Sequence, residues 1–200
     1  LGFGYRNAKI PYKAKEKYVS DIIPLFYYKR GDFELEGLSA RAKFIRHEKW
    51  RANIYTTYRF FDIPKEFQNE IRGSAFDHGL EFQFVHSRFW ESNAQFLVDG
   101  STRPYINLET KAGFSWKNVF LEPYAYVQVR STEFNNRYYG YNGTAKPGSG
   151  YEYGAGIETA IHIYENFNIL ANAKLSILDG HTANTDAINS RVSTETFLGI

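Results

Sequence analysis

Hydrophobic and polar side chains alternate along much of this 200-residue chain. The clearest example is residues 106–116, where every even-numbered position except Thr110 is apolar, whereas Asn107, Glu109 and Lys111 occupy odd-numbered positions. A repeat of two residues is the signature of a β-strand with two chemically different faces. We therefore predict that strands, not amphipathic helices, are the main elements of this protein.

Runs of the same kind predict eleven strands. Most of the clear runs are about 10 to 12 residues long, the length that a tilted strand needs to cross the hydrocarbon layer of a membrane, whereas strands of soluble sheets usually have about 5 or 6 residues. Because single-chain bacterial barrels have even strand numbers, we expect an all-β, antiparallel up-and-down transmembrane β-barrel of 10 or 12 strands. The clear runs are residues 50–60, 80–84, 106–116, 124–130, 153–163 and 167–177, and the less clear ones are residues 1–5, 22–30, 33–45, 92–98 and 191–200.

Residues 33–45 break the alternation. Apolar side chains occupy odd-numbered positions at Phe33 and Leu35 but even-numbered positions from Leu38 to Phe44. The phase changes around Gly37, and glycine tolerates the backbone geometry that a bulge demands. We expect a bulge or a bend at this point of the strand.

The predicted connections alternate between tight turns and long polar loops. Outer-membrane barrels have this asymmetry, with short turns on the periplasmic side and longer loops outside the cell. The tight turns lie near residues 47–49, 89–91, 117–118 and 165–166, and the long loops near residues 62–77, 99–104, 131–150 and 179–190.

Aromatic residues flank every tight turn. Amphipathic rings are favourably placed at the level of the lipid headgroups, so a set of rings at one end of a barrel indicates a membrane interface. We predict that five side chains form such a girdle: Trp50, Trp90, Trp116, Tyr164 and Phe167.

Composition narrows the function classes. Aromatic residues make up 18% of a chain whose mean hydropathy is −0.47, a pairing expected of a barrel with a polar interior and a lipid-facing exterior. The net charge of +2 gives no drive toward nucleic acid, and the absence of cysteine excludes thiol chemistry and disulfides. The longest stretch without charged or small polar residues, 22–28, is far shorter than the roughly 20 residues of a spanning helix. We predict a single domain over residues 1–200.

Three segments resemble the MipA/OmpV family, that of MltA-interacting protein: residues 22–44 (IIPLFYYKRGDFELEGLSARAKF), residues 137–156 (RYYGYNGTAKPGSGYEYGAG) and the opening LGFGY. The resemblance implies a barrel in the bacterial outer membrane of Gram-negative cells, linked in some members to scaffolding of peptidoglycan hydrolases and synthases, and in others to porin or adhesin roles. Family members finish on a terminal aromatic residue, whereas this chain stops at Ile200. We expect closing residues beyond one or both ends and, because methionine is absent, a processed or trimmed chain.

Candidate catalytic residues are few. His86 stands beside Ser87, but adjacent strand residues point to opposite faces and cannot pair as nucleophile and base. No histidines have the spacing of a metal-binding motif, and glycine pairs such as Gly154 and Gly156 precede no helix that would cradle phosphate. We predict a protein that is not an enzyme, with no catalytic residues, no metal site and no cofactor.

Charged side chains recur on the presumed inward face of the strands. Charge in a barrel interior needs either water or a partner of opposite sign. If the charges pair across the lumen, the barrel is a plugged scaffold; if Arg41, Lys43, Arg51 and Arg59 line open water, the lumen favours small anionic solutes. The candidate lumen-lining charges are Arg41, Lys43, Arg51, Arg59, Glu81, Glu109, Lys111, Arg130, Glu158 and Lys174, together with Glu195.

The loop at residues 131–150 carries Tyr138, Tyr139 and Tyr141 among asparagine and glycine residues. Because binding sites concentrate in loops, we consider an extracellular site for sugars or surface partners, with a simple folded loop as the alternative. The leading hypothesis is an outer-membrane scaffold whose partners are membrane lipid and peptidoglycan-remodelling enzymes or other envelope proteins. A narrow passive porin for small polar or anionic solutes is the alternative, and a lipid hydrolase is a third hypothesis.

Overall fold

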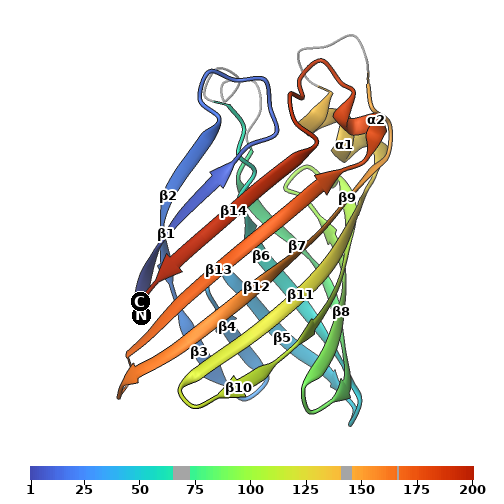
Figure 1. The fold of residues 1–200 in the computed structure, drawn as a ribbon. Helices are drawn as coiled ribbons and strands as arrows, with labels where there is room; N and C mark the ends of the chain where they lie inside the picture. Colours follow the sequence, from blue (N-terminus) through green and yellow to red (C-terminus); the bar gives the residue numbers. More distant parts are fainter. Residues whose placement is uncertain (65–72, 141–145, 166) are drawn as a thin grey trace.

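The computed structural model describes residues 1–64, 73–140, 146–165 and 167–200, and these residues form one antiparallel sheet curled into a barrel (Figure 1). Neighbours in the sheet follow the order β2-β1-β14-β13-β12-β11-β9-β8-β7-β6-β5-β4-β3, and β10 pairs beside this path with β11. The strands are β1 (Gly2–Lys9), β2 (Tyr18–Leu25), β3 (Tyr27–Arg30), β4 (Phe33–Glu36), β5 (Ser39–Arg46), β6 (Trp50–Arg59), β7 (Ala75–Ser87), β8 (Trp90–Val98), β9 (Pro104–Ala112), β10 (Phe114–Trp116), β11 (Val119–Arg130), β12 (Gly150–Tyr164), β13 (Phe167–Leu178) and β14 (Val192–Gly199).

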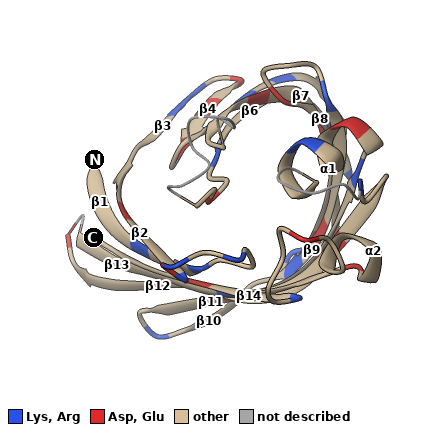
Figure 2. Ribbon diagram, turned by 90° about the horizontal axis from the view of Figure 1, so that it is seen from above, with Lys and Arg blue, Asp and Glu red and all other residues tan. Residues whose placement is uncertain are grey.

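The barrel is nearly closed. The two ends of the strand order, β2 and β3, are separated in the sequence by Phe26 alone. β2 pairs with β1 on one side, and β3 pairs with β4 on the other, so the chain itself joins the two edges of the sheet. Figure 2 shows the resulting ring of strands from above.

The all-β antiparallel barrel is confirmed, but the predicted count of 10 or 12 strands was wrong, because the described residues place 13 strands along the path. Two predicted strands are each divided. Residues 22–30 split at Phe26, and residues 33–45 split at Gly37, which makes a reversal instead of a bulge. Gly37 has φ +57°, a conformation that two-residue hairpin turns require and that glycine adopts without a steric cost.

The strands are apolar outside and polar inside. In β7, Phe76, Leu80 and Phe84 are at least 42% exposed, whereas Asp77 and Glu81 between them are 0% exposed. A soluble sandwich has the opposite arrangement, because it buries its rings beneath a second sheet. Only one sheet is present among the described residues, so these rings lie on the outer surface of the barrel wall.

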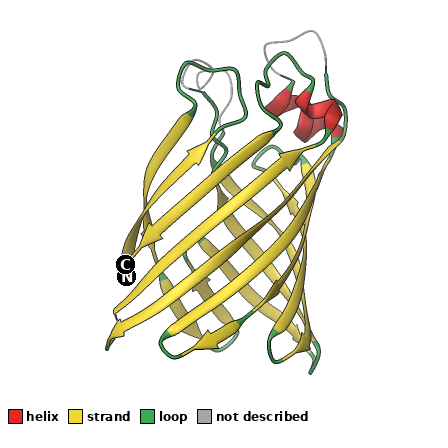
Figure 3. Ribbon diagram, in the orientation of Figure 1, coloured by secondary structure: helices red, strands yellow, loops and turns green. Residues whose placement is uncertain are grey.

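The two ends of the barrel differ. Short turns join the strands at one end, and the longer loops at the other end carry α1 (Thr132–Tyr139) and α2 (Gly180–Ala183) (Figure 3). We refer to them as the short-turn end and the loop end. The connection near residues 99–104, predicted as a long loop, is a tight turn held by the Asp99 side chain. In the described parts of the chain, no helix has the length and apolar character needed to cross a membrane.

The buried hydrophobic residues gather at the loop end. Viewed from above, α1 lies inside the mouth of the ring (Figure 2). Phe134 and Tyr138 of α1 pack against Phe61, with ring centroids 6.2 and 4.4 Å away. The cluster continues onto inward residues of the wall such as Leu97 and Tyr105. The loops therefore form an aromatic plug, defined here as α1 and the residues of this cluster.

Candidate functional site: the barrel lumen

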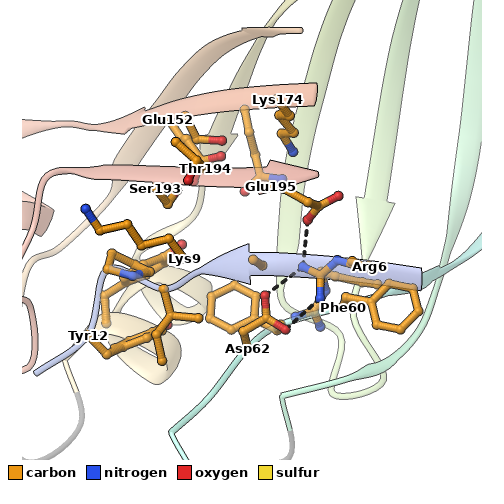
Figure 4. Close-up of a pocket in the computed structure, with 18 of the residues that line it drawn as sticks. Arg6, Lys9, Tyr12, Phe60, Asp62, Glu152, Lys174, Ser193, Thr194 and Glu195 are labelled. Atoms are coloured by element: carbon orange, nitrogen blue, oxygen red, sulfur yellow. Dashed lines mark hydrogen bonds and ion pairs between the residues drawn. The ribbon is translucent and has the colours of Figure 1, made fainter. Parts of the chain in front are cut away.

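A cavity of 330 Å³ lies in the lumen beneath the plug (Figure 4). It is lined by inward residues of strands from different parts of the barrel, and by the chain segments that follow β1 and β6. Its lining combines cations, carboxylates and rings, including Arg6, Tyr12, Asp62, Glu152, Lys174 and Glu195.

Arg6 dominates the charge of this cavity. Its guanidinium forms ion pairs with Asp62 and Glu195, both at 2.6 Å, and with Asp21 at 3.1 Å. The same group lies 5.0 Å from the centre of the Phe60 ring, and the residue is 4% exposed. A buried guanidinium needs such partners because an unpaired charge in the interior costs several kcal/mol. Sequence reasoning missed Arg6 because the predicted first strand ended at residue 5.

Arg59 joins the wall to the plug. It donates to both oxygens of Asp77, which also accepts a hydrogen bond of 2.6 Å from the Tyr105 hydroxyl. Arg59 also donates to the Tyr138 hydroxyl at 3.1 Å and lies 4.8 Å from the centre of that ring. The Tyr138 hydroxyl in turn donates to Asp99 at 2.9 Å. This chain of contacts fixes α1 across the mouth of the barrel.

Glu81 is the centre of a second group of charges, nearer the short-turn end. It forms an ion pair of 3.3 Å with Arg41, and it accepts hydrogen bonds from Asn53 at 2.8 Å and Gln95 at 3.0 Å. Arg41 also pairs with Glu34, which Lys43 contacts at 3.3 Å. Glu81 is fully buried, so these neighbours replace the water that its carboxylate would otherwise need.

A third group of charges surrounds Lys111. Its ammonium lies 2.9 Å from Glu122 and 3.3 Å from Glu91. Glu109 and Glu158, both predicted lumen residues, interact electrostatically with the same ammonium. One cation thus offsets several carboxylates across neighbouring strands.

Arg130 and Lys174 both contact aromatic rings, and Arg130 also lies near a carboxylate. Arg130 is 1% exposed, lies 3.8 Å from Glu152 and stands over the Tyr139 ring at 4.4 Å. The Lys174 ammonium lies 4.5 Å from the centre of the Tyr126 ring. Of the ten predicted lumen charges, Arg51 alone has neither a side-chain hydrogen bond or ion pair nor a contact with an aromatic ring among the described residues.

The predicted aromatic girdle lies at the short-turn end. Trp90, Trp116, Tyr164 and Phe167 are each more than half exposed. Trp50 is half-buried and stacks against His47 with ring centroids 5.8 Å apart. The contact of these rings with lipid stays a prediction.

The prediction of an exposed binding loop with Tyr138 and Tyr139 was wrong. Tyr138 and Tyr139 are 2% and 4% exposed, because residues 132–139 form α1 and turn both rings into the plug, so they are not an open binding surface. Tyr141 lies outside the described residues. The spacing of Phe134 and Tyr138, four residues apart, was the signal for a helix with one apolar face.

His86 contacts a serine, but not its sequence neighbour. Its Nε2 lies 2.9 Å from the Ser92 hydroxyl on the adjacent strand, on the exposed side of the wall. Ser92 donates in turn to Thr110, not to a carboxylate, at 3.1 Å. In a hydrolase triad a carboxylate contacts the other ring nitrogen of the histidine and stabilises the imidazolium, whereas Thr110 contacts the serine in this chain.

The family model for MltA-interacting protein MipA matches residues 1–200, the whole chain. This chain belongs to the MipA family. No curated protein matches it in sequence. Among solved structures, a bacterial polysaccharide outer membrane secretin is similar in fold, with a TM-score of 0.50 and 9% sequence identity over 100% of this chain and 97% of that chain. At this identity the likeness concerns the barrel fold alone.

For this MipA-family chain, the structure shows how the lumen is lined, which family membership does not describe. Ion pairs between nearby strands line the wall of the lumen, α1 lies in its loop end, and Arg51 at its short-turn end has no side-chain hydrogen bond or ion pair among the described residues. The two ends of the lumen therefore differ in chemistry.

Proposed function

We propose that this MipA-family protein is a non-enzymatic β-barrel of the bacterial outer membrane that acts as a scaffold for a murein-remodelling enzyme. Its outer wall supports the location, because a belt of exposed apolar side chains alternates with buried charge along each strand. Its exposed rings at the short-turn end support an interface with lipid headgroups.

The blocked loop end is the observation that carries the proposal. The aromatic plug occupies the mouth at that end, where Arg59 of the wall holds Tyr138 of α1. The charges of the wall are satisfied as well, because carboxylates on nearby strands neutralise Arg6, Arg41, Arg59 and Lys111. A barrel with one plugged end and a paired lining offers its surface to partners.

The name of the family supplies the class of partner, because MipA is described as an MltA-interacting protein. In an outer-membrane barrel, the short-turn end faces the periplasm, where the murein layer lies. We therefore place the docking surface for a murein enzyme on the short turns.

A binding assay tests this proposal. The purified barrel, immobilised in detergent, is presented with a purified peptidoglycan hydrolase of the MltA type, and retention is compared with that on an unrelated barrel of similar size. In a variant, Asn-Gly replaces residues 88 and 89, the two residues of the turn between β7 and β8. Loss of retention in this variant supports docking on the short turns. Equal retention on both barrels contradicts the scaffold function.

A narrow passive pore for small polar or anionic solutes is the second candidate. It is favoured by the 330 Å³ cavity under the plug and by the cations at the short-turn end. Single-channel recording in planar bilayers separates the two functions. The scaffold predicts a silent barrel, and steady anion-selective conductance would support the pore.

A further inference from the structure

The short-turn end of the lumen contains a second cavity, with basic walls. It has a volume of 720 Å³ and lies between the β3–β4 turn and the β5–β6 turn. Four of its lining residues are permanent cations, one is histidine and one is acidic. We call this set the basic mouth: Lys29, Lys43, Arg46, His47, Glu48 and Arg51.

Nearby carboxylates neutralise only part of this charge. Glu34 is shared, because it lies 3.2 Å from Lys29 and 3.3 Å from Lys43 while also pairing with Arg41. Arg46 pairs with Asp32 at 2.6 Å, but both side chains are about two-thirds exposed, and such pairs stabilise little. The Arg51 side chain has no hydrogen bond or ion pair in the parts of the chain that the structure describes.

The register of the sheet increases the excess of positive charge at this site. Arg46 of β5 lies directly opposite Arg51 of β6, and like charges in that position destabilise a strand pair. A register shift between Lys43 and Ile45 sets this pairing. Irregularities of this kind re-aim side chains near binding sites. The wall thus places two arginines at directly opposed positions of neighbouring strands, and a bound anion would remove the electrostatic cost of that pairing.

We infer that the basic mouth binds a phosphate group. Guanidinium groups form paired hydrogen bonds with phosphate, and lysine contributes a point charge to the same ion. The cavity volume is within the range of small-ligand pockets, about 300–1,000 Å³, so the phosphate can be one end of a larger molecule. This inference is independent of the scaffold function, since either a scaffold or a pore can carry the site.

Two sources can supply the same phosphate chemistry. One is a free phosphate or a phosphorylated solute in the aqueous lumen. The other is a phospholipid headgroup, because Trp50 flanks the same turn, stacks on His47 and is predicted to lie at headgroup level. The experiment has one arm for each source.

Thermal unfolding of the purified barrel in a zwitterionic detergent tests the site. Inorganic phosphate is titrated against sodium chloride at matched ionic strength, because salt alone screens the two arginines. The variants are Arg51→Gln and the control Arg88→Gln, which removes a cation from the next short turn, where Arg88 lies over the Phe89 ring and outside the cavity. If Arg51→Gln does not refold, Lys29→Gln replaces it, because Lys29 is about half exposed at the cavity wall.

We expect phosphate to raise the unfolding midpoint of the wild type and of Arg88→Gln, and Arg51→Gln to weaken this binding about tenfold, the loss of one charge-assisted contact. No phosphate effect beyond that of chloride, or an equal effect in all three proteins, overturns the inference. Dihexanoyl phosphatidylglycerol is the lipid arm. Tighter binding than that of inorganic phosphate assigns the site to a headgroup, and weaker binding assigns it to a free phosphate; both support the site.

Discussion

The arginines at the two ends of the lumen have different surroundings. At the loop end, Arg6 and Arg59 are each held by carboxylates and by aromatic rings, and both are almost fully buried. At the short-turn end, Arg46 and Arg51 oppose each other, and their surroundings carry fewer carboxylates than cations. A cation with enough buried partners holds structure together, whereas a cation without them is free to bind a ligand. This difference predicts effects of very different size when each arginine is removed.

The largest effect is expected for Arg59→Ala. Among the described residues, the substitution leaves the buried Asp77 carboxylate with only Tyr105 as a side-chain donor, and it frees Tyr138 of the plug. Breaking a buried ion pair by removing one partner costs about 3–5 kcal/mol, so we expect a loss of about 3 kcal/mol of unfolding free energy. Chemical denaturation in detergent measures it. Asp77→Asn in the same background should recover part of the loss, and a double mutant no more stable than Arg59→Ala would contradict the pairing.

A smaller loss is expected for Arg6→Gln. Three carboxylates lose their shared cation, but Asp21 and Glu195 have side chains 38% and 32% exposed and can be rehydrated. We expect a loss of about 2 kcal/mol, below the usual range for buried pairs. The same denaturation experiment ranks the two variants. A loss larger than that of Arg59→Ala would show that the cavity beneath the plug, and not the plug itself, holds the loop end together.

Acid should loosen the plug. Burial by itself would raise the pKa of Asp99, but hydrogen bonds from the backbone and side chain of Arg103, from the Ser101 amide and from the Tyr138 hydroxyl outweigh it and lower that pKa. A folded-state pKa below the unfolded value of about 3.9 stabilises the protein above that pH, and the stabilisation is lost as pH falls through the folded pKa.

We therefore expect the near-ultraviolet circular dichroism of the plug tyrosines to weaken below about pH 4, with little change between pH 5 and 7. Asp99→Asn should have a weaker signal at neutral pH and a flatter acid titration. Wild-type and variant curves of the same shape would show that Asp99 does not control the plug.

The smallest effect is expected for Arg51→Gln without phosphate. Since this side chain has no hydrogen bond or ion pair among the described residues, its removal should change stability by no more than about 0.5 kcal/mol, the usual range for a substitution that breaks no contact. In low salt the variant should be slightly more stable, because the repulsion from Arg46 is gone. A loss comparable to that of Arg6→Gln would remove the contrast between the two ends.

The strands of the wall could be predicted where alternation is unbroken. Residues 106–116 correspond to β9 and β10, interrupted at Gly113, and residues 167–177 correspond to β13 within one residue. Gly37 shows the limit of the pattern. A change of phase marks a departure from regular pairing, but both a bulge and a hairpin produce it, and pairing with a distant strand decides between them.

The candidate site was predictable in its residues but not in its contacts. The sequence placed Arg41, Arg59 and Glu81 on one face, but the ion pairs Arg41–Glu81 and Arg59–Asp77 join residues 40 and 18 positions apart in the chain, so only the pairing of the strands brings them together. Tyr138 was expected at the surface because a glycine- and asparagine-rich loop is usually exposed. It is buried because the barrel mouth is wide enough to admit the helix that carries it.

By itself, the sequence determined the two-faced strands, the barrel class and the outward position of the rings, because a period of two acts within each strand. The tertiary structure alone decided which charges neutralise one another, that α1 fills the loop end, and that Arg46 and Arg51 meet at the short-turn end. Those outcomes depend on the register between strands, which sets the distance between side chains that alternation can only assign to a face.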